Sequence, residues 1–123
     1  MALKTIRKVR IKEAAVFVEL PPFQRWRPTL LDDESFRALQ IELLRAPEAG
    51  DVIEGTGGLR KGRFADARRN KGKRGGLRVI YFWWDGGRQF WLFTVYDKDT
   101  QDDLSAEQKK VLHGLLKREL KER

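Results

Sequence analysis

The chain has 123 residues, of which 41% are hydrophobic, which is enough for one domain with a packed core. Its 26 Lys and Arg residues outnumber 18 Asp and Glu residues, and the net charge of +8 favours an anionic partner such as nucleic acid. The lack of Cys excludes disulfides and thiolate metal sites and is compatible with an intracellular protein, and no apolar run reaches the roughly 18 residues of a membrane span.

Residues 1–14 alternate basic and aliphatic side chains and lack the apolar centre of a signal peptide. Two interpretations remain open for this segment, an extra strand or a basic arm. The arm is favoured because nothing in the sequence caps or closes the segment. Residues 15–123 are expected to form a single domain.

A strand rich in Val and Phe is predicted over residues 15–20, and the prolines at 21–22 favour the first turn of a helix. A second helix is predicted to begin at Asp32 or Asp33, which are suitable N-caps, and to end before Pro47. Helical spacing predicts that each helix has an apolar face: Phe23 and Trp26 in the first, and Phe36, Leu39, Leu43 and Leu44 in the second.

A basic, glycine-rich segment, residues 55–78, begins within a turn-rich connection at residues 48–58. It holds nine Lys or Arg residues and one acid, so its net charge equals that of the whole chain. Within it, residues 59–65 are predicted to form a strand, and residues 66–76 a loop that stays mobile without a counter-charge. Such a local concentration of charge indicates a site for a polyanion.

Residues 77–84 are apolar on both faces apart from Arg78, as in a central strand that is covered on both sides. A turn at residues 85–87, whose glycines accept positive φ, leads to a returning strand over residues 88–96. The sheet is therefore expected to be mainly antiparallel, with residues 59–65 on its far side. Ser105 and Gln108 form a capping box for a last helix, with a predicted buried stripe of Val111, Leu112, Leu115, Leu116 and Leu120.

Several catalytic and ligand-binding motifs fail on inspection. The glycines at residues 55–58 lack the third glycine of a dinucleotide fingerprint, and Gly72-Lys73 is followed by Arg74 where a Walker loop needs Ser or Thr. The acids at residues 97–102 lack the Gly and Glu that a calcium loop requires. The single histidine, His113, is expected on the surface of the last helix. Histidine triads and histidine acid–base pairs therefore cannot be assembled.

The strand positions of Arg60, Arg63 and Arg78 fix these cations in space, and Tyr96 and Lys98 fall near Arg78 if the hairpin is in register. A buried-edge arginine such as Arg78 requires a specific anion. The resulting cationic groove, with a phenol at its rim, could bind a phosphodiester. It could also cleave RNA by holding the ribose 2′-OH in line with its own phosphate and stabilising the transition-state charge.

Three segments together resemble the RelE/HigB superfamily of type II toxin–antitoxin toxins, in its HigB-like branch. They are PEAGDVI at residues 47–53, GTGGLRK at 55–61 and GKRGGLRVIY at 72–81, followed by Tyr96 and Lys98. The resemblance covers about residues 16–116. It implies a RelE-like α+β fold, a small twisted and mainly antiparallel sheet with N-terminal helices packed on it and a C-terminal helix.

The resemblance further implies a cytoplasmic, ribosome-dependent messenger RNA endoribonuclease that inhibits translation without a metal or cofactor. Its implied partners are the ribosome, the messenger RNA and a cognate helix-turn-helix antitoxin. It would contact operator DNA only through this antitoxin, and no membrane partner is implied. The implied catalytic residues are Arg63, Lys73, Arg78, Tyr96 and Lys98. The implied RNA-binding residues are Arg60, Lys61, Arg68, Arg69, Lys71 and Arg74.

Two rival interpretations remain open. One is a non-catalytic nucleic-acid-binding domain that uses the same groove, and the other is a protein-interaction module whose basic face meets an acidic partner. Both nucleic-acid interpretations predict a steep salt dependence of binding, because phosphate neutralisation releases counterions.

Overall fold

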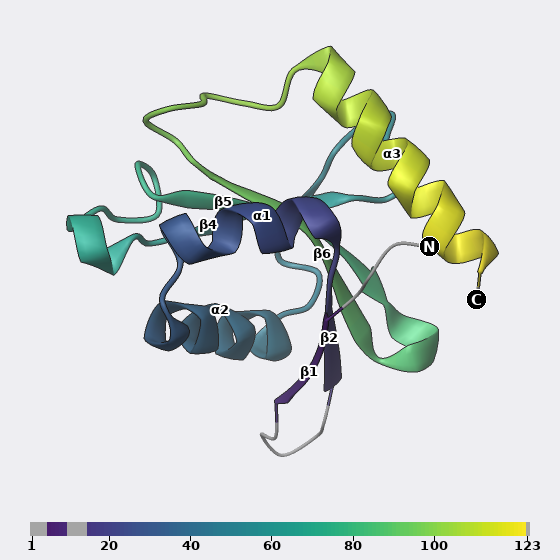
Figure 1. Cartoon of the computed structure of the whole chain (residues 1–123), viewed down its shortest axis with the longest axis horizontal. Helices are drawn as coiled ribbons and strands as arrows, with labels where there is room; N and C mark the ends of the chain where they lie inside the picture. The colour runs from purple at the N-terminus through teal and green to yellow at the C-terminus, as the bar shows by residue number, and fades with distance from the viewer. Residues whose placement is uncertain (1–4, 10–14, 123) are drawn as a thin grey trace.

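A computed structural model describes residues 5–9, for which only the main chain is described, and residues 15–122. The described chain forms a six-stranded sheet with three α-helices (Figure 1). The strand order is β1-β2-β6-β5-β4-β3. The strands are β1 (Thr5–Val9), β2 (Ala15–Glu19), β3 (Asp51–Val52), β4 (Arg60–Phe64), β5 (Leu77–Trp84) and β6 (Gln89–Asp97). The helices are α1 (Pro21–Leu30), α2 (Asp33–Arg45) and α3 (Ala106–Lys121), with short 3-10 turns η1 (Ala67–Arg69) and η2 (Asp85–Gly87).

The sheet is mainly antiparallel, as predicted, and β4 lies on the side of β5 away from β6. The one parallel pairing of the described sheet joins β2 to β6, and no local sequence pattern predicted it. The short strand β3, within the connection predicted to be turns, pairs with β4. Of the two interpretations of residues 1–14, the structure has a strand over Thr5–Val9, and residues 1–4 and 10–14 lie outside the described residues.

The two faces of the sheet carry separate cores because β5 is apolar on both sides, as its sequence predicted. On one face, Val79 and Tyr81 of β5 pack with apolar side chains of α1 and α2. On the other face, Ile80 packs with Trp91 of β6 and with Leu112 of α3. In the described part of the chain, no helix combines the length and the apolarity needed to cross a membrane.

Helix α1 packs along β6 beyond the point where β2 ends. Strand β2 pairs with the first half of β6 only, up to Glu19 opposite Leu92. Beyond that point α1 makes close contact with β6 and crosses it in Figure 1. The helix thereby covers a stretch of β6 that β2 leaves without a neighbouring strand.

The predicted helix caps are confirmed, but the predicted apolar stripes are too wide. Asp32 accepts a hydrogen bond from the Ser35 amide at 2.7 Å, and the Ser105 capping box is complete. Val111 and Leu120 were predicted to be buried, yet they are 55% and 42% exposed, and Trp26, predicted on the same apolar face as Phe23, is 45% exposed. The reason is geometric: a helix on a twisted sheet contacts it through a stripe narrower than its full apolar face.

The hairpin turn at η2 is present, but its left-handed residue is not a glycine. Arg88 has φ 51°, whereas neither Gly86 nor Gly87 has a positive φ. A Cβ on Gly87 would lie 2.4 Å from the ring of Trp84. Glycine is therefore needed here for close approach to an indole ring and not for its backbone freedom.

Candidate nucleic-acid interface

Three adjacent strands carry a row of polar side chains at one end of the sheet. In the strand register Arg63 of β4 lies opposite Arg78 of β5, and Arg78 lies opposite Tyr96 of β6. The expectation that Tyr96 falls beside Arg78 is therefore confirmed. Strand alternation puts this row on the face of the sheet that carries α3. We call Arg63, Arg78 and Tyr96, with the flanking Lys61 and Lys98, the cationic row.

The two β4 cations of the row are paired with surface carboxylates. A terminal nitrogen of Arg63 lies 2.9 Å from Asp51 Oδ2, and Lys61 Nζ lies 3.3 Å from Asp103 Oδ1. Both carboxylates are more than half exposed. Ion pairs in such positions contribute little to stability, so a phosphate can replace either carboxylate at small cost.

Arg78 is 4% exposed, and its hydrogen bonds differ from the expectation of a bound anion. Nη1 donates to the carbonyl oxygens of Lys73 at 2.7 Å and Leu77 at 3.2 Å, and Nη2 donates to that of Arg74 at 2.7 Å. Within residues 15–122, these main-chain carbonyls are the partners of the guanidinium. The buried charge is satisfied by peptide dipoles of the loop that precedes β5.

Tyr96 is only 7% exposed, so the expectation of a phenol at the groove rim is wrong. Its hydroxyl is buried and has no hydrogen-bond partner among the described residues. Burial and the negative charge of Asp103 raise the pKa of Tyr96 to about 12, against the opposing charge of Arg78. The phenol therefore keeps its proton at neutral pH and can act as a donor, not as a base.

The two lysines predicted to be catalytic are held in different places. Lys98 follows β6 directly and pairs with Asp102, whose Oδ1 lies 2.6 Å from Lys98 Nζ. Lys73 Nζ lies 3.3 Å from Glu42 Oε1 on α2. Because α2 packs on the opposite face of the sheet from the cationic row, the Lys73 side chain turns away from the row, to which Lys98 belongs.

The predicted RNA-binding residues are likewise divided. Arg60 donates to the carbonyl oxygens of Glu48 and Gly50, both at 2.9 Å, so it anchors the segment before β3. Arg68 lines a surface groove of about 350 Å³ beside α2. Arg74 is exposed and has no ion pair with the described residues. Of this predicted set, Lys61 is the residue that belongs to the cationic row.

The loop after β4 has counter-charges within the chain, which the sequence analysis did not identify. Arg69 Nε lies 2.6 Å from Asp66 Oδ2, and a second Arg69 nitrogen lies 3.5 Å from Asp97 Oδ1. Lys71 Nζ lies 3.1 Å from Asp99 Oδ2. The pairs with Asp97 and Asp99 tie the loop to the end of β6 and to the turn that follows it. Arg69 and Lys71 therefore act within the fold.

We expect Asp97 to make the stability of the fold sensitive to acid. Burial raises the pKa of Asp97, but hydrogen bonds from Thr100 and the charge of Arg69 outweigh burial and lower it. A lowered folded-state pKa contributes stability above the unfolded value of about 3.9, and that stability is lost as the pH falls through the folded pKa. Urea unfolding from neutral to acid pH should show a flatter pH dependence for Asp97→Asn than for the wild type.

The matched control for this experiment is Asp85→Asn, at an exposed turn position. It should retain the pH dependence of the wild type. If Asp97→Asn and the wild type lose stability in parallel as the pH falls, the carboxylate of Asp97 is not responsible.

Sequence reasoning missed the acids that face the cationic row. Asp103 accepts hydrogen bonds from the Leu104 amide at 2.8 Å and from Lys61, and its charge acts on Tyr96. From the sequence, the acids at residues 97–102 were interpreted as a solvated loop that leads to the Ser105 cap, and Asp103 was given no role in the site. The one sequence feature that could have indicated that Asp102 and Asp103 lie near the site is that they follow Lys98 closely in the chain. Among residues 15–122, no group of three or more His, Asp or Glu side chains is arranged to hold a metal ion.

The fold defines an α+β protein with three helices, a mostly antiparallel sheet and a C-terminal helix. No model of a known protein family matches the chain. Its function is therefore inferred from the residues and geometry described above.

Proposed function

We propose that this protein is the toxin of a type II toxin–antitoxin system, with a RelE-like fold and ribosome-dependent endoribonuclease activity on messenger RNA. In this proposal it acts in the cytoplasm, and a cognate helix-turn-helix antitoxin neutralises it. The observation that carries the proposal is the cationic row, in which the register aligns Arg63, Arg78 and Tyr96 across three strands. The α+β architecture and the motifs of residues 47–81 support it.

The row has the components of metal-independent RNA cleavage. The ribose 2′-oxygen bonds to phosphorus while the bond to the 5′-oxygen breaks, which leaves a 2′,3′-cyclic phosphate and a 5′-hydroxyl. Arg63 and Lys61 would stabilise the charge that develops on the phosphate oxygens. The 2′-hydroxyl proton would pass to solvent water, and the protonated Tyr96 would supply a proton to the 5′-oxygen.

A second candidate function, nucleic-acid binding without cleavage, is favoured by one specific observation. The Tyr96 hydroxyl is buried, so a phosphodiester docked on the exposed cations does not touch it unless nearby side chains move. A binding domain needs only Arg63, Lys61 and Lys98, which are accessible at the surface.

The test is to induce the wild type and Tyr96→Phe in bacterial cells and to map messenger RNA ends by primer extension. The toxin proposal expects growth arrest and new 5′ ends within translated codons for the wild type. It expects slower cleavage for Tyr96→Phe at equal protein levels, because the phenylalanine fills the same space but donates no proton. The same assay in purified translating ribosomes separates direct cleavage from host nucleases.

Absence of new 5′ ends in translating ribosomes, together with salt-sensitive RNA binding, would select the binding domain over the toxin. Cleavage that Tyr96→Phe leaves unchanged would retain the nuclease and remove Tyr96 from the proton transfer. RNA binding that does not respond to salt would contradict both candidates, because phosphate contacts weaken steeply as salt rises.

A further inference from the structure

Arg78 occupies an unusual position for a residue that recognises a free phosphate. Its side chain is almost fully buried between β4 and β6, and both terminal nitrogens donate to the loop at residues 72–76. Nη1 uses both of its protons, one on Lys73 and one on Leu77. An incoming phosphate would have to break these bonds or reach the remaining protons through a buried surface.

The loop held by Arg78 has restraints at both of its ends. At its start, Asp66 and Lys71 exchange main-chain hydrogen bonds of 2.8 and 2.9 Å. At its end, the Gly76 carbonyl accepts from the Lys98 amide at 3.0 Å, and a Cβ on Gly76 would lie 2.3 Å from the Phe64 carbonyl oxygen. Between these ends, the bonds from Arg78 to two successive carbonyls fix the path of the backbone.

The fork of a guanidinium suits this task. Arginine presents donors in a rigid planar arrangement that can reach two carbonyl oxygens at once, whereas a lysine ammonium is a single flexible point charge. The two carbonyls belong to Lys73 and Arg74, whose side chains are exposed. Within residues 15–122, the side chain of Lys73 is held by a surface ion pair with Glu42, which a phosphate can replace.

We propose that Arg78 is a positioning residue, which fixes the loop at residues 72–76 so that Lys73 and Arg74 meet RNA phosphates, and that it does not bind a phosphate itself. The RNA part of this inference rests on the proposed function, whereas the fixing of the loop does not. Arg78 thus differs from Arg63, which is next to it in the row but has an exposed guanidinium.

The first arm of the test measures the loop without RNA, by limited trypsin digestion of the full chain. Arg78→Lys keeps the charge and removes the fork, so cleavage after Lys73 and Arg74 should accelerate about tenfold or more, as expected for the loss of one or two hydrogen bonds. Arg37→Lys, at an exposed position of α2, should digest like the wild type. Equal digestion of Arg78→Lys and the wild type would overturn the inference, whatever the protein does to RNA.

The second arm measures the salt dependence of binding to a single-stranded oligouridylate. If Arg78 positions the loop, Arg78→Lys should reduce the slope of log affinity against log salt by about 0.7 to 1.4, the value of one or two phosphate contacts. It should cause no further reduction in a background of Lys73→Ala and Arg74→Ala. A slope equal to that of the wild type would instead assign a direct phosphate contact that lysine can replace.

A third measurement keeps Arg78 in place, because a variant of a buried residue can lose its fold. Guanidinium resonances of the wild type, followed by NMR during addition of the oligouridylate, should shift for Arg63 and stay constant for Arg78. A large shift of the Arg78 resonances, with faster exchange of its protons, would contradict the inference. If loop digestion accelerates in Arg78→Lys but the wild type binds no RNA, the proposed function fails and the positioning role stands.

Discussion

Arg63→Ala is expected to lower the rate of messenger RNA cleavage in translating ribosomes by about 100- to 1,000-fold, the range seen when one preorganised transition-state contact is removed. Arg63 is the arginine of the cationic row whose guanidinium reaches solvent, with a side chain that is 49% exposed. It stands beside Arg78 on the neighbouring strand and two strands away from Tyr96. The substitution removes a cation that would stabilise the negative charge that develops on the phosphate oxygens in the transition state.

The fold should survive this change, because the ion-pair partner Asp51 is itself 68% exposed and is not left buried. The control is Arg37→Ala, which removes the same charge from the exposed surface of α2. Primer extension on purified ribosomes gives the rate, and circular dichroism confirms the fold of both variants. Equal cleavage by Arg63→Ala and Arg37→Ala would show that net charge, and not the row, sets the activity.

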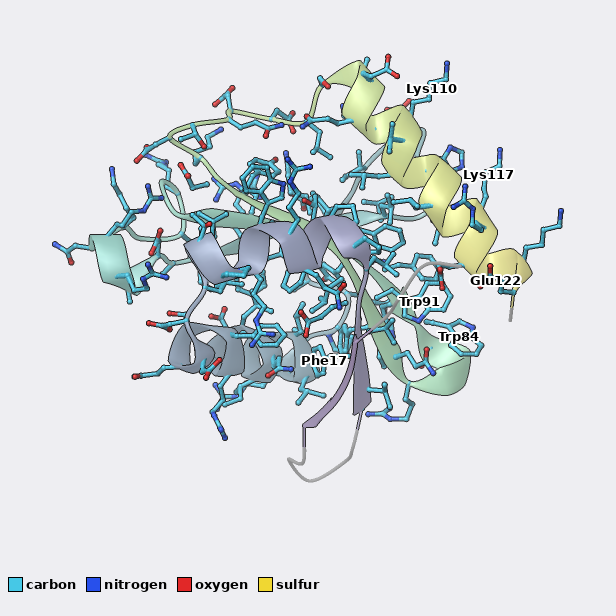
Figure 2. The ribbon with its side chains drawn as sticks, viewed as in Figure 1. Phe17, Trp84, Trp91, Lys110, Lys117 and Glu122 are labelled. Atoms are coloured by element: carbon cyan, nitrogen blue, oxygen red, sulfur yellow. The ribbon has the colours of Figure 1, made fainter. Side chains whose placement is uncertain are left out.

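Trp91→Ala is expected to lower the free energy of unfolding by about 3 to 5 kcal/mol, which is a large part of the total stability of a domain this size. Trp91 is fully buried on the face of β6 that α3 covers. Its ring lies 5.3 Å from that of Phe82 and 5.6 Å from that of Trp84, which Figure 2 shows beside it at the hairpin end of the sheet. Removal of the indole leaves a cavity between the sheet and α3.

The matched control is Trp26→Ala, which deletes the same side chain from a position that is 45% exposed. Urea denaturation of both variants should give a clearly larger loss for Trp91, since an exposed residue leaves no closed cavity. A loss of equal size at the two positions would mean that α3 does not form a packed layer with the sheet. That result would also weaken the proposed site, because the chain between β6 and α3 carries Asp102 and Asp103.

The exposed side of α3 differs from the face that packs on Trp91. Figure 2 shows Lys110 and Lys117 projecting from the helix away from the sheet. Their exposure agrees with the basic, solvated face that the helical spacing of residues 106–121 requires. The cations of α3 are therefore separate from the cationic row on the strands.

Local patterns in the sequence were sufficient for most of the fold. Residues 77–84 are apolar on both faces of the strand apart from Arg78, and this identified the central strand. The alternation of side chains along a strand put Lys61 and Arg63 on one face of β4. The pairing of Tyr96 with Arg78 depends in addition on a β-bulge between Ile80 and Tyr81, because the unshifted hairpin register would put Val95 opposite Arg78. The parallel pairing of β2 with β6 depends on contacts between residues far apart in the chain, and no short pattern encodes such contacts.

The residue types of the site could be predicted from the sequence, but the burial and the ion-pair or hydrogen-bond partners of these residues could not. The sequence concentrates cations in residues 55–78, but it does not show which of them have carboxylates or carbonyls as neighbours. Arg69 and Lys71 are neutralised by acids close in space, and Arg60 anchors main-chain carbonyls. These pairings form only when the strands bring the loops together.

The sequence by itself determined an α+β architecture, the order of the three helices and of strands β2, β4, β5 and β6, and the basic segment whose charge equals that of the whole chain, but it left β1 open and missed β3. These properties follow from side-chain periodicity and composition, which are local. Only the tertiary structure decided that Arg63 is exposed while Arg78, directly opposite in the register, is buried. The physical reason is the sheet: β3 pairs with β4 only at Arg60 and Lys61, so in the described sheet β4 has no outer strand beside Arg63, whereas Arg78 lies between β4 and β6 under a loop whose carbonyls satisfy its charge.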